Sequence, residues 1–356
     1  MIWRSTAAVS LIAVAVFALG KRLPECFAGE ETALAAAAFT LTDGKFRQEQ
    51  QSSPAAEPPT AATQAAEEVK PAAKVIPKKG KRDKTGYYDS YGDHTGEAKY
   101  SVAEKTIGAD DTMIETASIH NGTGIDYDFP AILTRPLTFH IDKNAAEPQV
   151  LIYHTHTSEA YLDEDVDFFY ESFYSRTQNA DFSVVGVGNA LAETLESRGI
   201  RTLHDTTVHD SAYIGSYDRS ADTVYADLDE HPSIRVVLDI HRDALGTEEC
   251  KVKTVFEHDG QKAAQIMILS GCDCYDERGF DHWQNNLSFA LKLQTTAERL
   301  YPGMTRPLSF DFFAYNEYIC DGSLLIEVGT DANSIDEVER TAQYLGNVIA
   351  EVLEKG

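Results

Sequence analysis

Positive charge is scarce in this chain relative to negative charge. Its 356 residues include 31 Lys and Arg against 57 Asp and Glu, which gives a formal net charge of −26. Phosphate contacts need clustered Lys and Arg, so this balance argues against a protein that binds nucleic acid. One short basic cluster, at residues 78–82, lies in a low-complexity segment, and we interpret it as part of a solvated linker.

Cysteine is also scarce, and its spacing does not match a zinc ribbon. The five cysteines contain no Cys-x-x-Cys pair, and their odd number leaves at least one thiol free. The chain has no Gly-x-Ser-x-Gly elbow, which argues against a serine hydrolase. Gly186-Val187-Gly188 lacks the third glycine of a dinucleotide-binding loop and is better explained as part of a helix.

The N-terminus carries a targeting signal. An apolar run from Ala7 to Leu19 has no charged residue and lies between Arg4 and Lys21-Arg22, a pattern that predicts a segment spanning or nearly spanning a bilayer. A cleaved signal peptide has an apolar region of the same length, but no clean Ala-x-Ala site follows. We therefore interpret residues 1–27 as an N-terminal membrane anchor or signal segment, and favour the uncleaved anchor.

Residues 28–112 are expected to form a low-complexity linker. As far as about Lys84 this part is rich in Ala, Pro, Glu, Gln and Lys, with prolines that would interrupt a helix. Residues from about Thr85 to Thr112 are polar and contain Gly and Tyr, which favours a linker or a partner-contact surface over a second domain.

Residues 113–356 alternate strand and helix patterns, which predicts one α/β domain. Its continuous apolar strands are typical of a mostly parallel central sheet with helices on both faces. Strands are expected at Val150–Tyr153, Ile200–Leu203, Ile234–Ile240, Val252–Glu257, Gln265–Leu269 and Leu324–Val328, with the fourth and fifth forming a hairpin. Helices are expected at Ser183–Ser197, Ser216–Asp229, Asp281–Leu300 and Ser334–Leu353.

Three of the expected strands end in residues that can carry chemistry. His154 and His156 follow the first, His241 follows the strand at 234–240, and Glu327 lies near the end of the last. Ligands of open parallel sheets bind beyond the carboxyl ends of the strands, so these residues should converge. Two imidazoles and a carboxylate, here that of Glu159, are the protein ligands of a catalytic zinc, which keeps a fourth position for water.

Glu327 suits the transfer of a proton in such a site. Zinc lowers the pKa of its water to about 7, and a nearby glutamate can accept that proton and pass it to a leaving group. Glu327 lies in an apolar stretch, where an ionised side chain is costly unless it faces a polar site or a metal. As an alternative, Glu327 could pair with Arg242, while Asp239 and Asp243 orient that arginine or His241.

Most of the remaining histidines are interpreted as surface residues, because they lie in loops or polar segments. A lone histidine at a strand end is also more often hydrogen-bonded structure than a ligand. The histidines placed at the surface are His204, His209, His231, His258 and His282.

Three stretches resemble the stage II sporulation protein P family. They are VLIYHTHTSEAY at Val150–Tyr161, VVLDIHRDA at Val236–Ala244 and LLIEVGTDANS at Leu324–Ser334. The resemblance extends from about Ile119 to the C-terminus, and the anchor and linker fit the same architecture. It implies a fold like that of the zinc-dependent N-acetylmuramoyl-L-alanine amidases.

The resemblance also implies roles for single residues. His241 corresponds to a zinc ligand and Glu327 to the catalytic glutamate. For the first ligand the end of the strand favours His156, with His154 two residues away as the alternative. For the carboxylate ligand we choose Glu159, with Glu171 as the alternative.

Members of this family are expected to act on septal peptidoglycan during engulfment. The implied reaction cuts the amide between the muramyl lactyl group and L-alanine, with endopeptidase activity on peptide cross-links as well. The implied partner is a stage II sporulation protein D-type transglycosylase, and the catalytic domain would lie between the mother-cell and forespore membranes. The alternative is a non-catalytic wall-binding or scaffold protein that retains the fold.

Overall fold

The computed structural model describes residues 82–110, 112–143 and 145–355. The expected membrane segment at residues 1–27 lies outside the described residues, as does the linker up to residue 81. Of the helices in the described ranges, none is long and apolar enough to cross a bilayer.

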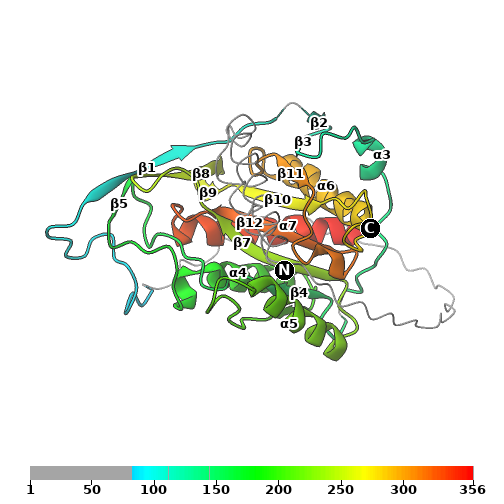
Figure 1. The fold of residues 1–356 in the computed structure, drawn as a ribbon, viewed down its shortest axis with the longest axis horizontal. Helices are drawn as coiled ribbons and strands as arrows, with labels where there is room; N and C mark the ends of the chain where they lie inside the picture. The colour runs from blue at the N-terminus through cyan, green and yellow to red at the C-terminus, as the bar shows by residue number, and fades with distance from the viewer. Residues whose placement is uncertain (1–81, 111, 144, 356) are drawn as a thin grey trace, which may run out of the picture. The chain divides into compact units, whose positions relative to one another are not determined.

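An eight-stranded mixed sheet runs through the protein in the order β2-β3-β11-β10-β12-β7-β4-β6 (Figure 1). The pairs β2–β3 and β10–β12 are antiparallel, and all other neighbours in this sheet are parallel. The expected α/β class with a mostly parallel sheet is therefore confirmed. Its strands are β2 (Thr112–Ile114), β3 (Ala117–Asn121), β4 (Val150–Tyr153), β6 (Thr202–His204), β7 (Val236–Asp243), β10 (Ile266–Gly271), β11 (Leu308–Asp311) and β12 (Ser323–Thr330).

Helices cover both faces of this sheet, as the alternation of side chains along β7 shows. Leu238 and Ile240 belong to the large core that includes residues of α4, α6 and α7, whereas Val237 packs in a separate cluster with Val224 of α5. The helices are α3 (Phe129–Leu133), α4 (Val184–Ser197), α5 (Ser216–Glu230), α6 (Trp283–Leu300) and α7 (Ile335–Lys355), with short 3-10 turns η1 (Ala180–Phe182) and η2 (Glu317–Ile319).

The helix starts follow from local sequence. Ser183 precedes α4 and its side chain accepts a hydrogen bond from the backbone N–H of Val185. Before α7, the backbone N–H of Ser334 donates to Glu337 Oε2 over 2.9 Å, and the N–H of Glu337 donates to Ser334 Oγ over 3.3 Å. This reciprocal pair is a capping box, and it confirms the start expected from the serine and the glutamate three residues on.

Two of the differences from the expected strands affect the site or the topology. β7 continues to Asp243, so His241 lies inside the strand rather than after it. In the hairpin, β8 (Cys250–His258) pairs with β9 (Gln261–Ala264), while Ile266–Gly271 belongs to the main sheet. The chain passes from one sheet to the other at Gln265, whose backbone N–H still bonds to Thr254 O. An apolar run cannot reveal such a change of partner.

A second sheet, of order β5-β1-β8-β9, includes part of the expected linker. β1 (Lys99–Lys105) pairs in parallel with β8 and antiparallel with β5 (Phe168–Tyr170). β1 thus belongs to the same compact unit as the rest of the described residues, although it lies before the expected boundary at residue 113. β1 is a polar strand whose partners lie far along the chain, so its composition alone resembles a linker.

Candidate metal and proton-transfer site

β7 and β12 place His241 and Glu327 side by side. The two residues are register partners on parallel strands, so their side chains leave the same face of the sheet. The His241 ring stacks with Tyr217 of α5 at a centroid distance of 6.4 Å, which identifies this as the face that α5 covers.

His156 reaches the same place from the loop that follows β4. Its ring is nearly perpendicular to that of His241 at a centroid distance of 5.3 Å, and it stacks on Tyr213 at 4.7 Å. The side chain is buried, and in the described part of the chain its Nδ1 has no hydrogen-bond partner. Leaving a buried polar atom without a partner costs about 1–3 kcal/mol, so such an atom indicates a site for a ligand or a reaction.

Glu159 supplies a carboxylate beside His241. Its Oε2 lies 3.4 Å from His241 Nδ1 and accepts the backbone N–H of Arg242 over 3.1 Å. Two ligands bound at about 2.0–2.1 Å to a tetrahedral zinc lie roughly 3.3 Å from each other. The separation of these two atoms therefore fits two neighbouring ligands of one metal ion.

Asp239 lies behind His241. Its Oδ1 is 2.9 Å from His241 Nε2, a contact that lacks the alignment of a good hydrogen bond. Thr155 holds the carboxylate in place, donating from its backbone N–H to Oδ1 over 2.9 Å and from its hydroxyl to Oδ2 over 2.7 Å. A carboxylate on the far nitrogen of a ligating imidazole is the usual support of a metal-binding histidine.

The charges around His241 favour a cation. Burial disfavours the imidazolium form, but Asp239 and Glu159 outweigh burial and raise the pKa of His241 well above its ordinary value. Burial also favours the neutral form of Glu159, yet Arg242 and His241 hold its pKa well below the ordinary value. Burial lowers the pKa of His156 to about 4, which keeps that imidazole neutral as a ligand must be.

Glu327 has the opposite electrostatic character. Burial and then the carboxylate of Asp243 raise its pKa to about 8, and its Oε2 is a buried atom without a hydrogen-bond partner among the described residues. A carboxyl group that changes protonation near neutral pH is suited to accept and donate protons.

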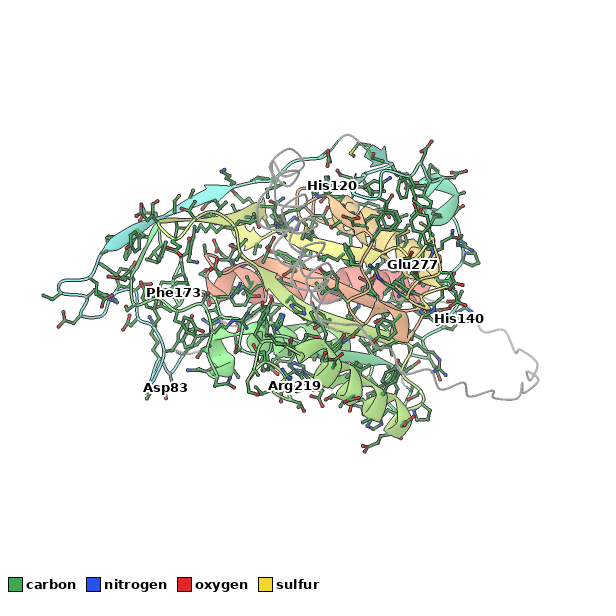
Figure 2. All side chains as sticks on the ribbon, in the orientation of Figure 1. Asp83, His120, His140, Phe173, Arg219 and Glu277 are labelled. Carbon is green, nitrogen blue, oxygen red and sulfur yellow. The ribbon has the colours of Figure 1, made fainter. Side chains whose placement is uncertain are left out.

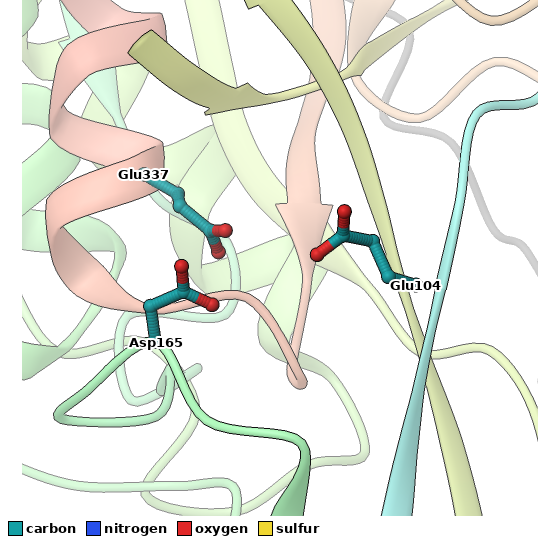
Figure 3. A group of neighbouring side chains, drawn as sticks. All are labelled: Glu104, Asp165 and Glu337. Atoms are coloured by element: carbon teal, nitrogen blue, oxygen red, sulfur yellow. The ribbon is translucent and has the colours of Figure 1, made fainter.

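Another group of three side chains meets a spacing typical of metal ligands. Glu104, Asp165 and Glu337 converge on one point (Figure 3), with ligand atoms all within 4.8 Å of one another, a spacing met by no other group in the described ranges. Lys253 occupies that point: its Nζ contacts Asp165 and lies 3.3 Å from Glu104 and 3.2 Å from Glu337. We interpret this cluster as an ion-pair network, because an ammonium group already neutralises its carboxylates.

His156, Glu159 and His241 thus do not meet the 4.8 Å spacing as they stand. His156 is the member that can close the gap, since its Nδ1 has no hydrogen bond to give up. The donor set, the 3.4 Å separation and the unpartnered imidazole nitrogen fit a zinc ion once that ring turns toward the pair.

The alternative ligands lie elsewhere. Both nitrogens of His154 are engaged, Nδ1 with Ile240 O at 2.8 Å and Nε2 with His204 Nε2 at 2.9 Å. Glu171 is exposed directly after β5, and its backbone N–H donates to Ala98 O. Neither residue joins His156 and His241.

Arg242 and Asp243 have other partners than those expected. The Arg242 guanidinium donates to the backbone oxygens of Ala160 and Ser175, and thereby holds the loop that carries Glu159. Asp243 pairs with Arg306 at 2.8 Å.

The surface assignment of His209 is wrong. The side chain is buried, with Nδ1 2.7 Å from His154 O and Nε2 2.9 Å from Thr223 Oγ1. Arg219, labelled in Figure 2, donates from Nε to the backbone oxygen of His209. His204 is also not a free surface group, since it pairs with His154.

Several residues near the site had no signal in the sequence. Tyr213 and Tyr217 provide the aromatic rings against His156, and Arg176 lies 3.9 Å from Glu159 Oε1 while pairing with Asp210 at 2.7 Å. Tyr213 lies in the loop before α5 and Tyr217 in its first turn, and no pattern of the sequence links the two rings to His156.

Comparisons with known proteins agree on one family. The sequence profile of stage II sporulation protein P matches residues 30–350. Stage II sporulation protein P of Bacillus subtilis strain 168 is 27% identical over 220 residues, which cover 57% of this chain and 50% of the relative. The chain thus spans about half the length of the curated relative it matches.

Solved amidase structures are similar at low sequence identity. An N-acetylmuramoyl-L-alanine amidase of Nostoc punctiforme is 11% identical with a TM-score of 0.33, covering 59% of this chain and 97% of the other. The CwlD amidase of Clostridioides difficile, in complex with the GerS lipoprotein, is 12% identical with a TM-score of 0.32 and coverages of 58% and 97%. An amidase of Mycobacterium smegmatis is 13% identical with a TM-score of 0.34 and coverages of 60% and 100%.

Proposed function

The chain belongs to the stage II sporulation protein P family, and on that premise we propose that it is a zinc-dependent peptidoglycan hydrolase. Its main reaction cuts the amide between the muramyl lactyl group and L-alanine, and peptide cross-links are a second class of substrate. The observation that carries this proposal is the convergence of His156, Glu159 and His241 beside the unpartnered carboxyl of Glu327.

The proposed zinc ligands are His156, Glu159 and His241. When bound, zinc supplies a Lewis acid for the amide carbonyl and lowers the pKa of a water molecule to about 7. Asp239 orients the His241 ring through its far nitrogen, and Arg242 fixes the loop of Glu159. Tyr213 stacks on the His156 ring and Tyr217 meets it edge-on, so the two tyrosines form the aromatic wall of the site.

Glu327 performs the proton transfers in this proposal. Its Oε2 accepts a proton from the attacking water and delivers it to the departing amide nitrogen, so that L-alanine leaves as an amine. A pKa of about 8 before any ion is bound leaves room for a nearby cation to lower it toward neutrality. A carboxyl group that acts first as a base and then as an acid works best with a pKa near the working pH.

The biological setting is part of the same proposal. The substrate is septal peptidoglycan during engulfment, and the domain is tethered through the N-terminal segment between the mother-cell and forespore membranes. Removal of stem peptides would expose bare glycan strands to a stage II sporulation protein D-type transglycosylase as the partner. The family membership of the chain supports these assignments.

The deciding experiment is digestion of purified muropeptides by the full chain with zinc, followed by mass spectrometry. The expected products are free stem peptides and lactyl-bearing glycan. His241→Ala should lose both stoichiometric zinc and hydrolysis, whereas His120→Ala, at an exposed histidine on β3, should keep both. Cleavage only within the peptides, with every lactyl–alanine amide intact, would remove the amidase assignment. Wall binding without zinc or hydrolysis would favour a scaffold.

A further inference from the structure

A cavity of about 510 Å³ lies beside the proposed site, between two segments distant in sequence. One wall comes from residues 86–97 of the expected linker and the other from residues 172–177. Figure 2 labels Phe173, from the second wall, whose ring lies 5.0 Å from that of Tyr88 in the first. A volume of this size is typical of sites for small ligands.

The first wall is fixed to the domain through a buried carboxylate. Asp163 accepts hydrogen bonds from the backbone N–H and the hydroxyl of Ser90, and it also pairs with Lys84. Tyr87 donates its hydroxyl to Tyr161 O and stacks on Phe182 at a centroid distance of 4.5 Å. The cavity therefore exists before any ligand binds, which lowers the ordering cost of binding.

The second wall connects the cavity to the metal ligands. Its residues 175–177 run antiparallel to residues 158–160, with hydrogen bonds from Thr177 N–H to Ser158 O and from Ala160 N–H to Ser175 O. Arg176 lines the cavity, and its guanidinium is 3.9 Å from Glu159 Oε1. A ligand in the cavity thus lies next to the proposed metal ligand Glu159.

The lining combines aromatic rings with charged groups that are already paired. Tyr87, Tyr88 and Tyr174 contribute rings, and Tyr174 is 71% exposed. The charged groups of the lining already have partners: Asp89 lies 3.3 Å from Lys84 Nζ, Glu97 lies 3.1 Å from His94 Nδ1, and Arg176 lies 2.7 Å from Asp210. Because these lining charges are already paired, they give the carboxylates of a stem peptide little to bind, and the cavity suits an uncharged, hydroxyl-rich ring that stacks on tyrosine.

We propose that this cavity is a saccharide subsite, which holds an uncharged sugar of the glycan strand next to the muramyl residue whose amide is cut. The inference rests on the proposed function for its place in the reaction, and on the cavity alone for its ligand. Tyr174 stacks on the sugar ring. The carboxylates of the first wall accept hydrogen bonds from the hydroxyl groups of the sugar. Longer glycan strands are therefore better substrates than single muramyl peptides.

Binding is tested with N-acetylchitotetraose as an uncharged probe, titrated calorimetrically into the full chain. Tyr174→Ala should weaken binding about tenfold, the size expected for one lost aromatic contact. Tyr174→Phe should stay within about twofold, because it keeps the ring. Tyr225→Ala, at an exposed tyrosine of α5, is the matched control and should leave binding unchanged. Binding that is equal in all four proteins would overturn the subsite.

Kinetics separate this inference from the proposed function. Tyr174→Ala should raise KM about tenfold on long peptide-bearing glycan strands, with kcat and the turnover of a single muramyl peptide unchanged. If the chain hydrolyses nothing but the probe still binds through Tyr174, the proposed function fails and the saccharide subsite stands. If hydrolysis proceeds with an unaltered KM, or if free stem peptide occupies the cavity in place of the probe, the subsite is wrong.

Discussion

Two carboxylate clusters of this protein differ in how their charges are met. Around Lys253, the carboxylates of Glu104, Asp165 and Glu337 share one ammonium group, and Lys262 pairs with the first two. Around His241, two carboxylates surround an imidazole, while the nearby Glu327 keeps a buried oxygen unpartnered. The two clusters therefore differ in whether a buried carboxyl oxygen is left without a partner, and not in the number of their carboxylates.

The two histidines that follow β4 also differ in whether their ring nitrogens have hydrogen-bond partners. His154 uses both ring nitrogens in hydrogen bonds, whereas His156, two residues on, has a buried nitrogen with no partner in the described residues. The first histidine stabilises the fold at the end of β4, and the second is available to a metal.

The largest effect is expected from the same substitution made once in each cluster. Glu327→Gln should lower amide hydrolysis by about 10³-fold, because it removes proton transfer and keeps the shape of the side chain. Bound zinc, measured by plasma mass spectrometry, should stay stoichiometric. Glu104→Gln, at a half-exposed carboxylate of the Lys253 cluster, should change turnover less than about twofold. Equal losses in the two variants would abolish the distinction between the clusters.

The support of His241 gives the next effect. Asp239→Asn keeps an oxygen for Thr155 but removes the charge behind the His241 ring, and should weaken zinc binding about 10–100-fold. Competition with a fluorescent chelator measures this affinity. Asp165→Asn is the control from the other cluster and should leave zinc affinity unaltered. An unchanged affinity in Asp239→Asn would mean that Asp239 serves only to bind Thr155.

Local sequence patterns were enough for much of the fold. The strand at Val150–Tyr153 and the capping box at Ser334 and Glu337 are encoded within a few residues, and both are present in the structure. β1 and the pair His154–His204 depend on contacts between segments far apart in the chain. Their residues carry no apolar period of their own, so a linker and a surface histidine were the natural interpretations.

The candidate site also has a part that local sequence patterns indicate and a part that depends on contacts between distant segments. The convergence of His156, His241 and Glu327 follows from the strand ends of a mostly parallel sheet, which a sequence can indicate. The choice of His156 over His154 needed the hydrogen bonds of both rings. Arg176 belongs to a loop whose position depends on pairing with residues 158–160, and no pattern in its own segment indicates it.

Removing the cation of the Lys253 cluster should affect stability and leave catalysis intact. Lys253→Met leaves the buried carboxylate of Glu337 with only Asn333 and Ser334 as partners, and should lower the free energy of unfolding by about 2 kcal/mol. Urea unfolding measures this loss. Zinc content and turnover of the folded variant should match the parent protein. A loss of both zinc and turnover in the folded variant would show that the Lys253 cluster supports the site at His241.

The smallest effect is a pH dependence of stability in chelator-treated protein. The pKa of Glu327 is raised to about 8 from an ordinary 4.5, so folding favours its protonated form and the charged form destabilises the fold. Below pH 4.5 the group is neutral in both states and contributes nothing; between pH 4.5 and 8 its penalty grows, and above 8 the penalty is complete.

Glu327→Gln lacks this penalty. Its melting temperature should therefore equal that of the parent protein near pH 5 and exceed it by several degrees near pH 8, when the two are compared by scanning calorimetry. A difference that stays constant with pH would place the Glu327 carboxyl in a solvated position, and would make the Lys253 and His241 clusters alike in having every charge met.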